Sequence, residues 1–214
     1  MKKTVLLGPG GHASVVLNIL KQYQDIKIIG FTDASYSENK SYKTFPVLGT
    51  DEILLELKEA EQADYAFITV GSIKDNHLRE KLFEKIDEIG YKTFNIIDKS
   101  SVIAENVNLG KGNLISPGAI INPDVIIADN NIINTGSIIE HETKIGSHIH
   151  IAPGAVLAGG VKVSNLTHIG LGAKIIEGIT IGENCLIGAG AVVINDIPDD
   201  SIVVGVPGEI IKKR

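Results

Sequence analysis

The chain has 214 residues, a formal net charge of −6 and one cysteine, a length that suffices for one large or two small domains. The acidic balance, without a concentrated basic run, argues against nucleic acid or an anionic membrane surface as partner. A lone Cys185 cannot form an internal disulfide, which fits a reducing compartment. No apolar stretch approaches the roughly 20 residues of a membrane helix. We therefore expect a cytoplasmic protein without membrane insertion.

The first 98 residues alternate short apolar strands with helical apolar spacing. The pattern predicts strands at residues 4–7, 26–31, 65–70 and 92–97, and helices at 14–20, 51–62 and 74–89. Such alternation is typical of a parallel sheet covered by helices. We expect residues 1–98 to form a small, half-Rossmann-like α/β domain, because they supply only about half of a full dinucleotide fold.

A glycine-rich turn follows the first predicted strand. The pattern Gly8-x-Gly10-x-x-Ala13, with Asp33 about 20 residues further on, formally matches a dinucleotide fingerprint. A turn of this kind lets backbone amides and a helix N-terminus approach a phosphate. Three interpretations of this turn remain open: it binds NAD, it binds another nucleotide-bearing ligand, or it only connects the strand to the helix.

A strict six-residue repeat of aliphatic side chains runs through the second half. It holds for sixteen consecutive positions without an insertion: Ile103, Leu109, Ile115, Ile121, Ile127, Ile133, Ile139, Ile145, Ile151, Leu157, Val163, Ile169, Ile175, Ile181, Ile187 and Val193. Hexapeptide repetition predicts a parallel β-helix in which three six-residue sides close one coil. Stacked coils bring the aliphatic side chains into a ladder inside a triangular prism. We therefore expect residues 99–214 to form a β-helix domain with a short C-terminal extension.

The six-residue frame also assigns residues that would otherwise suggest chemistry. Cys185 falls four positions after an inward aliphatic, where a packed structural thiol is expected instead of a nucleophile. Pro117, Pro123 and Pro153 fall two positions after an inward aliphatic, at corners where a missing strand donor is tolerated.

The stretch GSIIEHETKIGSHIH, residues 136–150, holds three histidines and two glutamates. Because Ile149 is an inward position, His148 and His150 flank it and can both face outward, whereas His141 lies on another side of the prism. Zinc stays an alternative that would need ligands brought together from different chains. We expect His148 to be a surface residue, and His168, one coil after His150, to contact either a cofactor or solvent. No role is assigned to His77.

Four motifs together resemble one family: GGH at residues 10–12, FTD at 31–33, IEHE at 139–142 and VVGVP at 203–207. The whole chain resembles the bacterial sugar O-/N-acyltransferases of the hexapeptide-repeat superfamily. These include PglD-like UDP-4-amino-sugar N-acetyltransferases and NeuD-like sialic acid O-acetyltransferases. The resemblance implies that the prism is a left-handed β-helix and that three chains form a homotrimer with active sites between subunits.

The resemblance also implies the roles of residues at the acetyl-transfer site. His141 corresponds to the catalytic histidine of the family, and Glu142 orients it. His150 corresponds to a contact with the thioester end of acetyl-CoA. Gly159, Leu171 and Ala189 correspond to later coenzyme contacts, made mostly through the backbone. No metal is expected.

The N-terminal domain carries the substrate positions that the resemblance implies. Gly10, Gly11, His12, Asp33 and Gly71 match positions that hold the nucleotide-sugar in the family. UDP-sugar members can carry two acidic residues after the second strand, whereas here Asp33 is followed by Ala34. The resemblance therefore leaves open which nucleotide is bound.

The resulting hypothesis is acetyl transfer from acetyl-CoA to the amine of a UDP- or dTDP-linked 4-amino sugar. A neutral histidine is a suitable base for deprotonating an attacking amine near pH 7, and a carboxylate on its other nitrogen would fix the tautomer. O-acetylation of sialic acid or a related sugar is the alternative within the family. A zinc-dependent β-helix enzyme of the carbonic anhydrase kind and a pure sugar-nucleotide binding module are the alternatives outside it.

Overall fold

The computed structural model describes residues 1–37, 39–72 and 75–214, and the chain divides into two compact units. Unit 1 contains Met1–Gly71 and Leu78–Ile96, and unit 2 contains Ser72–His77 and Ile97–Arg214. The short segment Ser72–His77 therefore packs with the second unit although it interrupts the first in sequence. No helix in the described part of the chain is long and apolar enough to span a membrane.

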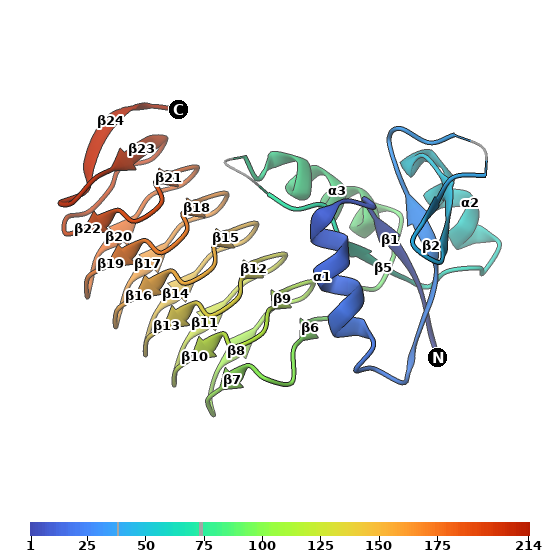
Figure 1. Ribbon diagram of the computed structural model, residues 1–214, viewed down its shortest axis with the longest axis horizontal. Helices are drawn as coiled ribbons and strands as arrows, with labels where there is room; N and C mark the ends of the chain where they lie inside the picture. Colours follow the sequence, from blue (N-terminus) through green and yellow to red (C-terminus); the bar gives the residue numbers. More distant parts are fainter. Residues whose placement is uncertain (38, 73–74) are drawn as a thin grey trace. The chain divides into compact units, whose positions relative to one another are not determined.

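Unit 1 is a five-stranded sheet with helices, as the alternating pattern predicted (Figure 1). Its strand order is β3-β4-β2-β1-β5, and β1 (Lys2–Leu7) pairs in parallel with both β2 (Ile26–Thr32) and β5 (Tyr65–Ile68). The helices are α1 (Gly11–Leu20), α2 (Leu54–Glu59), which follows the 3-10 turn η1 (Asp51–Ile53), and α3 (His77–Glu88). Val5, Leu6 and Leu7 are fully buried. Such an unbroken apolar run is typical of a parallel strand that is covered on both faces.

Three features of unit 1 differ from the predicted elements. An antiparallel pair, β3 (Ser41–Tyr42) and β4 (Phe45–Gly49), extends the sheet edge where no strand was expected. The strand expected at residues 92–97 divides: Lys92 only bridges to Tyr65, while β6 (Ile96–Ile97) joins the β-helix sheet. The helix expected at 74–89 begins at His77, and its first expected residue lies outside the described residues.

Unit 2 is a parallel β-helix whose coils repeat every 18 residues. Three stacked sheets are built almost entirely from two-residue strands, from β7 (Val102–Ile103) to β22 (Val192–Val193). The pairing is in register, so that β10 (Ile120–Ile121) lies beside β13 (Ile138–Ile139), which lies beside β16 (Val156–Leu157). Two longer strands, β23 (Ser201–Val204) and β24 (Glu209–Lys213), end the unit as an antiparallel pair.

The remaining short strands follow the same pattern. They are β8 (Asn108–Leu109), β9 (Leu114–Ile115), β11 (Ile126–Ile127), β12 (Ile132–Ile133), β14 (Lys144–Ile145), β15 (His150–Ile151), β17 (Lys162–Val163), β18 (His168–Ile169), β19 (Lys174–Ile175), β20 (Thr180–Ile181) and β21 (Leu186–Ile187).

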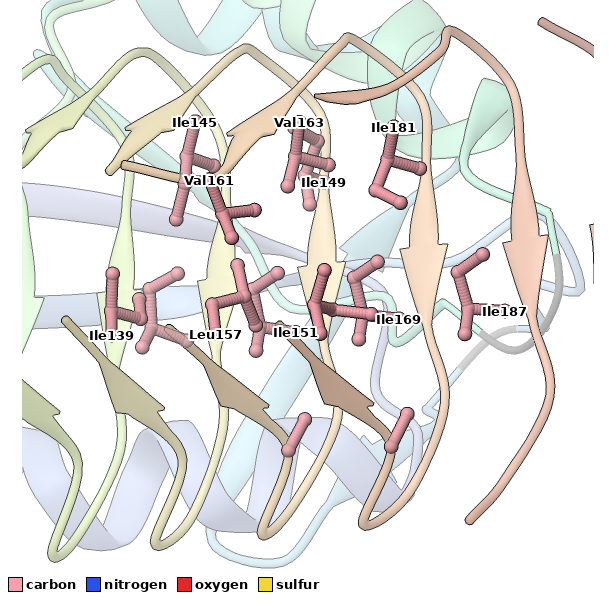
Figure 2. Packing of buried hydrophobic residues seen from close by; sticks show 14 of the residues in the cluster. Ile139, Ile145, Ile149, Ile151, Leu157, Val161, Val163, Ile169, Ile181 and Ile187 are labelled. Carbon is pink, nitrogen blue, oxygen red and sulfur yellow. The ribbon is translucent and has the colours of Figure 1, made fainter. Parts of the chain in front are cut away.

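The aliphatic ladder fills the inside of the prism, as predicted (Figure 2). Ile139, Ile151 and Leu157 are fully buried, and only the first two rungs, Ile103 and Leu109, are partly exposed, because no coil precedes them. Cys185 is buried in the same interior, and burial raises the pKa of its thiol. The thiol is therefore a packing group, as the frame predicted.

The corners between the sheets repeat as regularly as the strands. At the corner that follows β7, β10, β13, β16 and β19, each coil has one residue with positive φ: Asn106, Asp124, Glu142, Gly160 and Gly178. This left-handed conformation turns the chain onto the next sheet. Glycine and asparagine adopt it readily, whereas glutamate does so at a cost.

Candidate active site

The glycine turn after β1 is shaped by close contact with the end of β5. A side chain at Gly8, where φ is +95°, would meet Val70, with the nearest atom at 2.3 Å. Thr69 Oγ1 donates to the carbonyl oxygens of Leu7 and Gly8, both at 2.8 Å, and so fastens the two strand ends together. Space is open around Gly10 and Gly11, and the first turn of α1 holds no acidic residue. These amides are therefore free of competing negative charge, as an anion-binding helix start requires.

His12 lies at this turn as a neutral imidazole. Burial, reinforced by the nearby positive charge of Arg79, lowers the pKa of His12 to about 4. Its Nε2 atom is buried and has no hydrogen-bond partner among the described residues. A side-chain atom added at Gly71 would come within 3.1 Å of His12, so the glycine leaves room for the ring. The structure thus brings Gly10, Gly11, His12 and Gly71 together.

Arg79 on α3 binds the end of β5, next to the glycine turn. Its guanidinium is buried and donates to the carbonyl oxygens of Ile68 and Val70, the latter at 2.6 Å. Burial lowers its pKa to about 9. Because the surroundings of this guanidinium are of low polarity, its positive charge would stabilise an anion bound nearby.

Asp33 follows β2 and is held by its own loop. One carboxylate oxygen accepts from the backbone N–H and hydroxyl of Ser35, both at 3.0 Å, and the other pairs with Lys40. The hydrogen bond from Lys40, followed by that from Ser35, holds the pKa of Asp33 below its usual value. A cavity of about 200 Å³ between Asp33, Gly8 and the apolar side chains of Leu78 and Leu82 lies beside it.

His141 and Glu142 lie next to each other at the corner after β13. His141 Nδ1 and Glu142 Oε2 are 3.2 Å apart, and the two side chains are 60% and 71% exposed. The backbone beneath them is fixed by the coils on either side, since Glu142 N–H donates to Pro123 O and Gly160 N–H donates to His141 O. The Nδ1 contact leaves Nε2 as the nitrogen directed away from the carboxylate.

Glu142 has a left-handed backbone conformation, which is unfavourable for glutamate. Its φ is +60°, and the other residues at this corner position are asparagine, aspartate or glycine. A left-handed glutamate costs roughly 1–2 kcal/mol. A residue retained against such a cost is a candidate for function, because strain of this kind gathers at active sites.

His150 is buried and hydrogen-bonded within unit 2. Its Nδ1 lies 2.6 Å from the carbonyl oxygen of Ser72, so Nδ1 carries the proton and Nε2 accepts from Asn134 Nδ2 at 3.0 Å. The ring of His168 packs edge-on at 4.8 Å, and burial lowers the pKa of His168 to about 4. Both nitrogens of His150 are thus occupied, and a contact with a cofactor would have to displace one bond or use the ring face.

The other expected coenzyme residues lie at two different corners. Gly159 lies beside His141, at the corner after β13 and β16. Leu171 and Ala189 are both exposed and stacked one coil apart at the corner after β18 and β21, with Gly190 N–H donating to Leu171 O. The prism keeps these two corners apart within one chain.

Several residues around the candidate positions carry no signal in the sequence. Tyr42 donates to Gly10 O at 2.8 Å and lies 2.7 Å from Ser14 Oγ, which fixes the glycine turn. Asn76 is buried and donates to the carbonyl oxygens of Leu166 and Thr167, both at 3.0 Å. These contacts join residues that are far apart in the sequence, so no local sequence pattern predicts them.

The histidines of residues 136–150 are spread over different contacts in the described part of the chain. Within residues 1–37, 39–72 and 75–214, no group of three or more histidine, cysteine or acidic side chains could hold an ion. His148 is half-buried and contacts Asn130 Nδ2 through Nδ1 at 2.9 Å.

The fold is a hexapeptide-repeat β-helix with an added α/β unit. Residues 3–86 match the PglD N-terminal domain family. No match was found among curated protein sequences.

Solved structures match over nearly the whole chain. PerB from Caulobacter crescentus, in complex with CoA and GDP-perosamine, is 36% identical, with a TM-score of 0.88 over 99% of this chain and 98% of that chain. A histidine-to-asparagine variant of perosamine N-acetyltransferase from the same organism, with the same ligands, is 34% identical, with a TM-score of 0.89 over 100% and 98%. The acetyltransferase domain of PglB from Neisseria gonorrhoeae is 28% identical, with a TM-score of 0.87 over 99% and 100%. The chain therefore belongs to the family of bacterial sugar acetyltransferases with left-handed hexapeptide β-helices.

The buried neutral state of His12 predicts a loss of stability in acid. The unfolded chain binds a proton on His12 below about pH 6.5, but the folded chain does so only near pH 4. The free energy of unfolding should therefore fall as the pH falls between these values. Urea unfolding at about pH 7 and about pH 5 measures this loss. His12→Gln should lose less stability than the native chain over the same interval, and His168→Gln should do likewise; an equal loss in His12→Gln would contradict the assignment.

Proposed function

We propose that this protein transfers the acetyl group of acetyl-CoA to the amine of a nucleotide-linked amino sugar. The observation that carries this proposal is the exposed His141–Glu142 pair on a β-helix that is joined to a glycine-turn α/β unit. Related structures with this architecture hold CoA with GDP-perosamine, or acetyl coenzyme A. N-acetylation is favoured over O-acetylation because one of these relatives is a perosamine N-acetyltransferase.

His141 acts as the general base in the proposed reaction. Nδ1 is held by Glu142, so Nε2 accepts the proton that the amine loses as its nitrogen attacks the thioester carbonyl carbon. The carbon–sulfur bond then breaks, and the proton passes to the departing thiolate, so the products are the sugar acetamide and free CoA thiol. Glu142 stabilises the imidazolium that exists between the two transfers.

In this proposal the glycine turn binds the nucleotide end of the substrate. Gly10 and Gly11 offer open space and amides at the start of α1, and the buried cation of Arg79 lies near His12. These features suit a diphosphate. Asp33 and the adjoining cavity with its apolar wall suit the nucleoside. UDP, dTDP and GDP sugars are all candidates, the last because of the GDP-perosamine bound by a relative.

The proposed active enzyme is a homotrimer with its sites between subunits. The outward side chains of the sheet that contains β13 are mainly apolar: Val102, Ile120, Ile138, Val156 and Val192, with Lys174. The outward positions of the next sheet are mainly polar: Asn108, Lys144, Lys162 and Thr180, with Ile126. An apolar face that ends at the His141 corner supports burial against a second copy. A neighbour would also bring Leu171 and Ala189 to the corner of His141.

The first test measures thiol release from acetyl-CoA. GDP-, UDP- and dTDP-linked 4-amino sugars are offered as acceptors, with sialic acid as the hydroxyl acceptor. We expect turnover with at least one amino sugar, and His141→Ala should lower kcat by about 10²–10⁴-fold while the oligomer stays intact. Turnover with sialic acid alone would overturn N-acetylation, and near-native turnover of His141→Ala would remove His141 from the mechanism.

Glu142→Asn should separate stability from activity. Asparagine adopts a left-handed conformation more easily than glutamate, so the free energy of unfolding should rise by up to about 1 kcal/mol. At the same time kcat should fall, because the imidazole loses its orienting carboxylate. The matched control is Asn106→Glu at the same corner position two coils earlier, where φ is +63°. This control should lose a similar stability and keep its turnover; a fully active Glu142→Asn would contradict the role of the carboxylate.

The oligomer is tested by its mass in solution. Analytical ultracentrifugation should give three times 22.8 kDa, about 68 kDa. Ile120→Lys places a charge on the apolar face and should yield monomers with little activity, whereas Ile126→Lys on the next sheet should remain trimeric. A monomer with full activity would show that no neighbouring chain completes the site.

A further inference from the structure

The ring of His141 lies directly over Gly159, the residue one coil further along the chain. A Cβ atom built on Gly159 would lie 2.6 Å from Cε1, 2.7 Å from Nε2 and 3.3 Å from Nδ1 of His141. Carbon contacts below 3.0 Å essentially never occur at a real Cβ. The imidazole therefore fills the space that any side chain at this position would need.

The backbone does not require a glycine at residue 159. Pro123, His141 and Glu177 occupy the same corner position in neighbouring coils, and each carries a side chain. Positive φ at this corner belongs to the next residue of each coil, here Gly160 with φ +69°, and Gly159 itself lies outside that region. Gly160 therefore provides the left-handed conformation of the turn, whereas Gly159 leaves the space that the His141 ring occupies.

We propose that Gly159 is a positioning residue, whose missing side chain leaves room for the Cε1–Nε2 edge of the His141 ring and so keeps the imidazole in its observed position. This proposal rests on the proposed role of His141 as the base. It is distinct from a coenzyme contact through the Gly159 backbone, which the introduction of a methyl group would leave available. Two features fix the ring position in this proposal: the contact of Nδ1 with Glu142, and the space left by the absent side chain of Gly159 next to Cε1 and Nε2.

The size of the effect follows from the geometry. To reach ordinary contact at 3.4 Å, the imidazole would have to retreat by about 0.8 Å from a methyl group at residue 159, or rotate and give up Glu142. Displacement of a catalytic group by about 1 Å can cost about 10²-fold in rate. The fold should tolerate the substitution, because the corner position accepts side chains in other coils.

The test is Gly159→Ala, compared with Glu177→Ala at the same position one coil later. We expect kcat of Gly159→Ala to fall about 10- to 100-fold. The KM values for acetyl-CoA and the amino sugar and the melting temperature should stay near native. Glu177→Ala should keep all four values. A rise in the KM for acetyl-CoA with kcat unchanged would mean that the methyl group only obstructs the coenzyme, and would overturn the proposal.

A double-mutant cycle separates this proposal from the proposed function. If His141 is the base and Gly159 acts through it, Gly159→Ala should have no further effect on the residual rate of His141→Ala. An equal loss of rate in both backgrounds would overturn the role of Gly159 while leaving His141 as the base. Full activity of His141→Ala would overturn the proposed function itself. A crystal structure of Gly159→Ala should show the ring displaced, and an unmoved ring would contradict the inference.

Discussion

Stacking of one aliphatic side chain on the next, 18 residues further along the chain, is the contact on which the β-helix depends. The strands are two residues long and too short to specify a register by their hydrogen bonds alone. Ile121, Ile139, Leu157 and Ile175 lie in register inside the prism because only that alignment buries all of them. A shift by one residue would turn the whole set outward. The same register brings His141 above Gly159, so the interior packing also sets the geometry of the candidate site.

Corner positions accept more kinds of side chain than strand positions do, and the candidate catalytic pair His141–Glu142 lies at a corner. Interior positions must be aliphatic or small, whereas a corner position can hold proline, histidine, glycine or glutamate without disturbing the stack, as Pro123, His141, Gly159 and Glu177 demonstrate. Each corner is nevertheless rigid, since backbone hydrogen bonds fasten it to the coils on both sides. Rigid support with variable side chains is what a positioned catalytic group needs. Glu142 is one of the corner residues with a left-handed backbone that its residue type disfavours, as are His148 and Leu166.

The periodic part of the structure could be predicted from the sequence, and the long-range polar contacts could not. The six-residue frame predicted the β-helix and the interior place of Cys185, because each depends on a repeating local rule. It could not predict that Ser72 accepts a hydrogen bond from His150, since the two residues are 78 positions apart. The Lys40 partner of Asp33 and the β3–β4 pair were missed for a related reason: they lie in a segment with no apolar period. The predicted roles of the site residues, His150 among them, stay predictions.

The rigidity of the prism supports the proposal that the active site is completed by a second chain. Within one chain, His141 and the exposed pair of Leu171 and Ala189 lie on different corners, and the stacked coils allow no motion that would bring them together. A flexible fold could close around a long coenzyme, but a close-packed β-helix cannot. A cleft for such a ligand is then formed most simply where the corner of one prism meets a different corner of another. An apolar face bordering the histidine would hold the two prisms in a fixed position, so the interface that stabilises the oligomer would also set the distance across which the acetyl group moves.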